Sequence, residues 1–229
     1  MRVFFVGLLL LTLPASASFI NYSAREINLK LVYVSASDAA GRANLEYVYG
    51  KTNPEAKGKF ISLAVEDGSH VQFFDFLPLS LGEIRGFKVR FHLYTSVGGK
   101  GAEATRRLIL KGVDGVVFVA DGDPKRSAEN VRAFKQLKGD LAALGYDWKT
   151  TPITVQVQGE GVAQPMTPEV VAQALGLSDQ PVFSATPVNG VGVFDTLKSS
   201  AKQMLLELKK GVPDAGTTVV SPPRGSAHH

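Results

Sequence analysis

The stretch from Val32 to Gly50, VYVSASDAAGRANLEYVYG, has the residue pattern of a loop that holds a phosphate group. An apolar strand runs into a loop of small residues, and a helical pattern follows. Helix N-termini at such loops bind anions, because their free backbone N–H groups and the helix dipole favour negative charge. The loop lacks the Gly-Lys-Ser/Thr sequence that usually completes it. The stretch therefore indicates either a nucleotide site or a site that has lost its chemistry.

Composition predicts one α/β domain and excludes several kinds of chemistry. The 229 residues are 45% hydrophobic and 20% charged, with a net charge of +4, which is typical of a globular domain. The absence of cysteine excludes disulfides, thiolate nucleophiles and cysteine-based zinc sites. The four histidines have no metal-ligand spacing, so no metal site is expected. Basic residues do not alternate with aromatics, so no nucleic-acid partner is expected.

The two ends of the sequence differ from its middle. In residues 1–17, an apolar run follows Arg2 and ends in the small-residue triplet Ala15-Ser16-Ala17, which predicts a secretory signal and an exported, periplasmic protein. The alternative is a cytoplasmic protein whose start codon is misassigned. This run is short for a spanning helix, so membrane contact is expected only through this segment if it is uncleaved. Residues 212–229 read as a disordered tail.

Between these ends, residues 18–211 alternate apolar runs with helical patterns. The runs 28–35, 113–121 and 151–158 predict buried strands, and 123–145 and 192–211 predict helices. The runs 70–79 and 86–95 predict a hairpin, with Pro78 ending its first strand and the turn spanning 81–86. This order predicts a six-stranded, mostly parallel sheet with one antiparallel strand and helices on both faces.

Several long segments resemble one bacterial family. They are SFINYSAREINLKLVY, FFDFLPLSLGEIRGFKVRFHLYT, LILKGVDGVVFVAD and GVGVFDTLK, and together they extend the resemblance over about 18–211. They closely resemble the MglA-type small GTPases of gliding motility and cell polarity. This resemblance implies a Ras-like, three-layer P-loop fold and a guanine nucleotide with Mg²⁺ as the family's ligand.

The resemblance places four residues at the signature positions of the phosphate loop, G-x-x-x-x-G-K-T. These positions hold Ser35, Ala40, Gly41 and Arg42. Gly41 stands where the lysine neutralises the β- and γ-phosphates, and Arg42 stands where a hydroxyl holds Mg²⁺. Asp38 adds a carboxylate to the loop. We therefore expect the phosphate loop to be degenerate.

The two switch segments also depart from the family pattern. In the first, LAVE replaces LATE, so Val65 stands where a threonine contacts Mg²⁺ and the γ-phosphate. In the second, TSVGGK replaces T-V-P-G-Q, which keeps Gly98 and puts Gly99 where a glutamine positions the attacking water.

The motif that reads the guanine base is N-K-x-D in the family. Here Gln158, Gly159 and Gly161 hold its three defined positions, and Glu160 lies one position before the aspartate site. Each missing charge-assisted hydrogen bond costs roughly 1.5–3 kcal/mol. After a discount for non-additivity, three such losses amount to about 5–8 kcal/mol, or roughly four to six decades of affinity.

From these positions we expect a pseudo-GTPase with no catalytic residue, no cofactor and no bound metal, which is not an enzyme. It would act as a protein-binding module of a gliding-motility or cell-polarity system. The resemblance implies roadblock-type regulators and polarity or motility proteins as partners. One alternative is an active GTP-binding GTPase, with GTP or GDP and Mg²⁺, in which Glu160 and Arg42 take over by a shifted register. Another is an exported structural accessory of the motility machinery.

Two groups of residues are candidates for contacts with a protein partner. Phe73 and Phe76 belong to an alternating run with Phe74, Leu77 and Leu79, on a strand that can face the core on one side only. We place its opposite face near a sheet edge, where strand pairing or apolar contact is available. Arg106 and Arg107 lie on the helix after the second switch, and we expect an exposed helix face that contacts an acidic partner.

Overall fold

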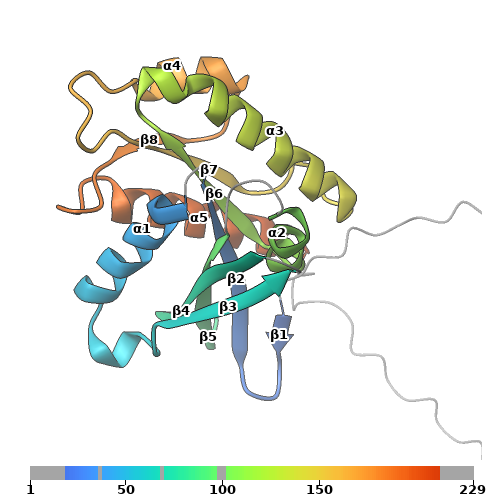
Figure 1. The fold of residues 1–229 in the computed structure, drawn as a ribbon. Coiled ribbons are helices and arrows are strands. Elements are labelled where there is room, and N and C mark those ends of the chain that lie inside the picture. Colours follow the sequence, from blue (N-terminus) through green and yellow to red (C-terminus); the bar gives the residue numbers. More distant parts are fainter. Residues whose placement is uncertain (1–18, 36–37, 68–69, 97–101, 212–229) are drawn as a thin grey trace, which may run out of the picture.

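The computed structural model describes residues 19–35, 38–67, 70–96 and 102–211 (Figure 1). The predictions for residues 1–17 and 212–229 lie outside these ranges. Within them, no helix has both the length and the apolar character needed to cross a bilayer.

An eight-stranded sheet forms the middle layer, in the order β3-β4-β5-β2-β6-β7-β8 with β1 paired to β2. The strands are β1 (Phe19–Asn21), β2 (Glu26–Ser35), β3 (Ile61–Asp67), β4 (His70–Ile84), β5 (Phe87–Ser96), β6 (Gly115–Asp121), β7 (Ile153–Gln158) and β8 (Val182–Ala185). The helices are α1 (Asp38–Lys51), α2 (Glu103–Leu110), α3 (Ser127–Ala143), α4 (Pro168–Leu175) and α5 (Val193–Gly211), with short 3₁₀ turns at Pro54–Ala56 and Pro124–Arg126.

The strand directions confirm the predicted mostly parallel sheet. β5, β2, β6, β7 and β8 run parallel, whereas β4 is antiparallel to both β3 and β5. The sheet has eight strands rather than six. β1 is also antiparallel to β2, and its three residues are too few to show a period in the sequence.

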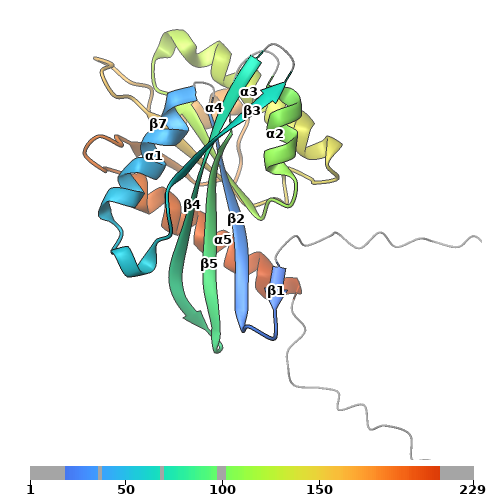
Figure 2. The same cartoon turned by 60° about the horizontal axis from the view of Figure 1, so that its bottom comes forward.

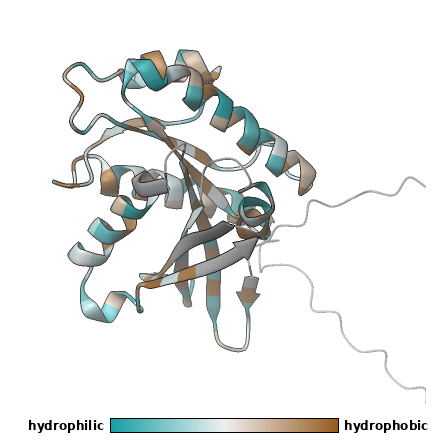
Figure 3. Ribbon diagram, in the orientation of Figure 1, coloured by the Kyte–Doolittle hydropathy of each residue, from teal (hydrophilic) through white to brown (hydrophobic). Residues whose placement is uncertain are grey.

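Helices cover both faces of the sheet and bury two apolar cores (Figures 1 and 2). On one face, α1 and α5 pack on residues such as Leu31 and Phe91. On the other, α2, α3 and α4 pack on residues such as Val116 and Phe118. β6 is buried along almost its whole length, as a central parallel strand must be. In Figure 3 the apolar colour gathers in the central strands, and polar colours mark the outer helix faces.

The β4–β5 hairpin is longer than predicted. Pro78 does not end β4, because the strand continues to Ile84, and the carbonyl of Pro78 accepts a hydrogen bond from Gly58 N at 2.9 Å. The turn is the two residues Arg85 and Gly86, with φ of 51° and 78°. Two left-handed residues match the twist of the flanking strands, which is why short hairpins favour this turn.

Candidate nucleotide-binding site

The carboxyl ends of β2, β6 and β7 meet at one edge of the sheet. These strands end at Ser35, Asp121 and Gln158, and they are neighbours in the parallel sheet. Ligands of open α/β sheets bind at this edge, where the loops after the strands gather. α1 begins at Asp38, directly after the loop that follows β2, and residues 36–37 of that loop lie outside the described ranges. The sequence therefore places its phosphate-loop positions where a nucleotide would bind.

Gly41, at the lysine position, lies where α1 packs against β5 and β2. A Cβ atom built on Gly41 would lie 3.3 Å from Cγ2 of Thr95 and 3.6 Å from Cβ of Tyr33. A Cβ atom at this position would crowd the methyl group of Thr95 and would make an ordinary contact with Tyr33. The glycine therefore allows close packing of α1 on the sheet, and it offers no ammonium group to a phosphate.

Arg42, at the magnesium position, connects α1 to β3. Its Nε donates to Glu46 at 2.7 Å, and its Nη1 donates to Oγ of Ser62 at 3.0 Å. The guanidinium also lies 5.5 Å from the ring centre of Phe60. These contacts hold the arginine on the outer side of α1, where it bridges to the edge strand.

A buried amide network joins β7 to the start of α1. Nε2 of Gln158 donates to the carbonyl of Ala40 at 3.2 Å and to Oε1 of Gln156 at 3.0 Å. Nδ2 of Asn44 donates to the same Oε1 at 2.8 Å, and Gln156 donates in turn to Oγ1 of Thr196 on α5 at 3.1 Å. Gln158, at a base-reading position, therefore faces inward and joins the end of β7 to the start of α1.

The loop after β7 is built around its glycines. A Cβ atom on Gly159 would lie 2.4 Å from Cβ of Pro165, so the lysine of the family motif has no room here. Gly161 has a φ of 74°, in the left-handed region that favours glycine. Glu160 lies exposed between them. The structure places the alternative base-reading carboxylate in this loop but shows no contact that fixes it.

Three buried polar atoms near the start of α1 have no hydrogen-bond partner among the described residues. They are Oδ1 of Asn44, Oγ of Ser96 and the hydroxyl of Tyr33. Burial also raises the pKa of Tyr33, so this hydroxyl keeps its proton. Unpaired buried polar atoms are costly, and ligands or water commonly satisfy them. Together with the N-terminus of α1, they fit a ligand held by backbone N–H groups and neutral polar atoms. The ammonium and the magnesium hydroxyl of the family motif are replaced.

The structure describes the switch positions only in part. Val65 lies in β3 opposite Gln72 of β4, and nothing is described of its side chain. Gly98 and Gly99 lie outside the described ranges. The expectations for these three positions therefore stay predictions.

The two arginines of α2 lie in different environments. Arg106 is 6% exposed and forms an ion pair with Asp140 of α3, so its expected place on an exposed face is wrong. Arg107 is partly exposed and contacts Asp140 at 2.8 Å and Glu103 at 2.5 Å. The amphipathic pattern of α2 turns Arg106 toward α3, where a buried carboxylate receives it. Partner contact through Arg107 stays a prediction.

Phe73 and Phe76 lie on β4, which is an inner strand because β3 covers its other side. Their expected place near a free edge is therefore corrected. The ring of Phe76 stacks on His92 at 5.7 Å and contacts Tyr94 at 4.8 Å. Nothing is described of the Phe73 side chain. The end strands of the described sheet are β3 and β8.

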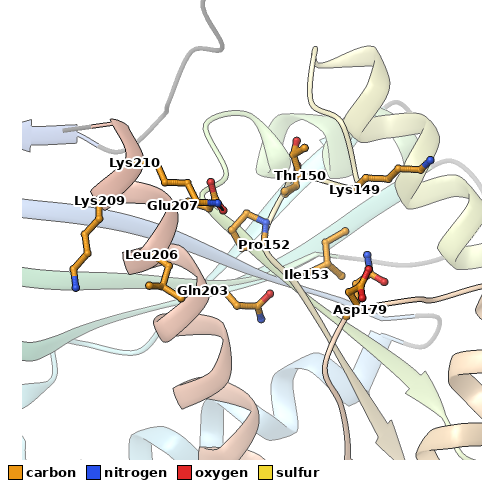
Figure 4. Close-up of a pocket in the computed structure, with 12 residues that line it drawn as sticks. Lys149, Thr150, Pro152, Ile153, Asp179, Gln203, Leu206, Glu207, Lys209 and Lys210 are labelled. Carbon is orange, nitrogen blue, oxygen red and sulfur yellow. Dashed lines mark hydrogen bonds and ion pairs between the residues drawn. The ribbon is translucent and has the colours of Figure 1, made fainter. Parts of the chain in front are cut away.

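Two hollows on the described surface lie along α5 rather than at the strand ends just described. One, of about 510 Å³, is lined by α5 and by the loop that enters β7 at Ile153 (Figure 4). Lysines and acids share its rim: Lys210 and Glu207 form an ion pair of 2.5 Å there. Within the part of the chain that the structure describes, no group of three metal-binding side chains is found.

A mostly parallel sheet with helices on both faces, and a strand–loop–helix turn at its carboxyl edge, is an architecture that Ras-like domains share with other α/β nucleotide-binding folds. No protein-family model matches the chain. It is 51% identical over 194 residues to "Mutual gliding-motility protein MglA" of Myxococcus xanthus, a match that covers 85% of this chain and 99% of that protein. The chain belongs to the MglA-type family of bacterial small Ras-like GTPases.

This relationship corrects two expectations. The chain was expected to be no enzyme and to take no cofactor, and both expectations are wrong, because close membership of a GTPase family implies GTP or GDP with Mg²⁺. The error has a physical reason. The expectation counted side chains at motif positions, whereas phosphates are also held by backbone N–H groups of a loop and a helix N-terminus.

Two functional candidates escaped the sequence analysis. Asn44 and Gln156 are buried in the amide network, although they belong to no motif position considered there. The only available signal was polarity inside an apolar pattern. Gln156 lies in β7 between Val155 and Val157 and is fully buried, and buried polar groups need partners.

Proposed function

We propose that this chain is a guanine-nucleotide-binding GTPase of a gliding-motility or cell-polarity system whose nucleotide loops are altered. The observation that carries the proposal is the 51% identity to MglA over almost the whole folded region. The carboxyl edge of the sheet also supports this proposal. The ends of β2, β6 and β7, the N-terminus of α1 and the buried amide network lie together there, where ligands of open α/β sheets bind.

The residues that would hold the nucleotide differ in kind from those of the family motif. Backbone N–H groups at the start of α1 would face the phosphates, with Ser35 and Ser96 beside them. The loop after Gln158, with Glu160, would face the base. The nucleotide supplies the phosphate bond that is hydrolysed, and this chain's residues bind and orient it. Neutral donors bind phosphate less tightly than an ammonium group, so we propose weaker binding than the family's full motif gives.

Slow turnover follows from the second switch. A glycine at position 99 carries no amide side chain to orient a water molecule. We propose that the chain acts mainly by binding proteins, with roadblock-type regulators and polarity or motility proteins as the partners that the family suggests. The edge strand β3 and Arg107 are the proposed contact regions.

A nucleotide-dependent role favours a cytoplasmic location, because GTP is maintained in the cytoplasm. We therefore propose the cytoplasmic alternative over export for this chain. Mass spectrometry of the N-terminus of the native protein tests this proposal. Cleavage after Ala17 together with recovery from the periplasm would overturn it.

Calorimetric titration of the full chain with GDP, GTP and ATP in the presence of Mg²⁺ tests the nucleotide proposal. We expect saturable binding of the guanine nucleotides, weaker by about four to six decades than nanomolar, and weaker or no binding of ATP. A substitution at the site, Ser96→Val, should weaken the binding. The matched control is Ser178→Val, which changes an exposed loop far along the chain.

A further inference from the structure

An apolar groove runs beside α5 on the face of the sheet that α1 and α5 cover. Its volume is about 540 Å³. Its floor is formed by Leu79 of β4 with Leu197 and Ala201 of α5, and Phe194 and Leu205 extend the apolar lining along the helix. The residues that line this groove differ from those of the candidate nucleotide site.

A ridge of lysines follows one side of the groove. Lys198, Lys202 and Lys209 line it and are exposed. Their spacing of four and seven residues places them on one stripe of α5, since such intervals return to the same side of a helix. Lysine stems cover apolar surface while the ammonium groups stay in water. The groove thus combines an apolar floor with a row of positive charges at its rim.

The size and charge of the groove identify the kind of occupant. Small-molecule sites have volumes of about 300–1,000 Å³ and are mostly apolar with a few polar groups. An α-helix with its side chains is about 10–12 Å wide, and three turns of it exceed this volume more than twofold. A slender alkyl chain with an anionic head matches both the apolar floor and the lysine ridge.

We propose that this groove binds a free long-chain carboxylate, with its alkyl chain along Leu197 and Ala201 and its carboxylate beside Lys202. This proposal goes beyond nucleotide binding and does not depend on it. The test measures displacement of dansyl-undecanoate from the full chain by octanoate, decanoate, dodecanoate and tetradecanoate, each below its micelle concentration. Burial of methylene groups predicts about a fourfold gain in affinity per added methylene until the groove is filled. Alcohols of the same lengths should bind less tightly.

Two substitutions locate the site. Lys202→Glu should weaken dodecanoate binding about fivefold or more, because it replaces an attraction at the rim by a repulsion. Lys135→Glu makes the same charge change on α3, on the other face of the sheet, and should leave binding unchanged. Ala201→Leu fills the floor and should weaken binding about tenfold. If that variant melts early, Lys198→Glu provides a second rim test that leaves the core intact.

Several results would overturn the proposal. If the affinity does not depend on the chain length of the carboxylate, the apolar floor does not bind the alkyl chain. Equal effects of Lys202→Glu and Lys135→Glu on dodecanoate binding would show that the lysine ridge does not hold the carboxylate. Binding to phosphatidylglycerol vesicles or to an acidic amphipathic peptide, without competition by dodecanoate, would assign the groove to a membrane or a protein instead.

Discussion

Gln158 at the end of β7 donates a hydrogen bond to the carbonyl of Ala40 in α1, with Nε2 and O 3.2 Å apart. One residue at a base-reading position thereby touches one at a phosphate-loop position. The two halves of the candidate site are joined by protein contacts, and Gln156 and Asn44 complete the link. In this chain the neutral amide network holds together the edge that charged motif residues define in the family.

Removal of the Gln158 amide should weaken the contact between the end of β7 and the start of α1. Gln158→Ala removes two hydrogen bonds at a partly buried position, so we expect a loss of about 1–2 kcal/mol in the free energy of unfolding. Guanine-nucleotide affinity should fall with it. Urea unfolding and GDP titration measure the two effects. Gln136→Ala on the exposed side of α3 is the control, and equal losses in both variants would argue against the network.

Gly159 should not tolerate the lysine that the family motif places there. A Cβ atom would meet Pro165 at 2.4 Å, so Gly159→Ala should destabilise the fold by about 1–3 kcal/mol. The additional change Pro165→Gly should restore most of the loss.

Gly139 of α3 provides the opposite case within the same chain. A Cβ atom built there meets nothing within 4 Å, so Gly139→Ala should stabilise by roughly 0.5–1 kcal/mol. Chemical unfolding distinguishes the two sites. Similar effects at both glycines would contradict the packing described for the loop after β7.

Substitution of Arg106 should destabilise the fold much more than substitution of Arg107. Arg106→Met leaves the carboxylate of Asp140, which is 3% exposed, with one cation fewer, and it should cost about 3 kcal/mol. Arg107→Ala changes a partly exposed pair and should cost at most about 1 kcal/mol. Thermal melting of both variants is the measurement. A larger loss of stability for Arg107→Ala than for Arg106→Met would contradict the assignment of Arg106 as the buried partner of Asp140.

His92 should make the fold less stable in mild acid. Burial and the neighbouring Arg90 lower the pKa of His92 below its ordinary value of 6.5, although Glu26 acts in the opposite direction. The unfolded chain therefore binds a proton first as the pH falls below 6.5, and stability decreases between 6.5 and the lowered pKa.

The substitution His92→Asn isolates this effect. The variant should lose less stability than the original chain between pH 7.5 and about 5.5, the range around the ordinary pKa of 6.5 in which the histidine of the unfolded chain takes up its proton. Urea midpoints at the two pH values give the comparison. Equal slopes in both chains would exclude His92 as the source.

Sequence reasoning predicts the layers of this fold well, because the period of apolar residues depends on local structure. The central strand β6 and the helix α5 follow directly from their patterns. Pro78 misled the prediction of β4, since its carbonyl still pairs although it has no N–H group. β1 escaped because pairing with β2, rather than local pattern, makes it a strand.

The sequence predicts where the candidate site lies in the fold, but it does not predict which side chains contact one another there. The family positions of Gly41 and Arg42 follow from the resemblance, whereas the approach of Thr95 and the bond to Ser62 depend on how α1 packs in space. The burial of Arg106 similarly depends on Asp140, which is 34 residues away along the chain. Long-range partners of this kind leave no periodic signal in a single sequence.

Titration of the full-length chain with GDP in the presence of Mg²⁺, with ATP as the comparison, tests the central proposal most directly. The proposed function requires saturable binding of GDP at one site per chain, with weaker or no binding of ATP and with loss of affinity in Gln158→Ala. Absence of saturable GDP binding at millimolar concentrations, or equal binding of both nucleotides, would contradict it.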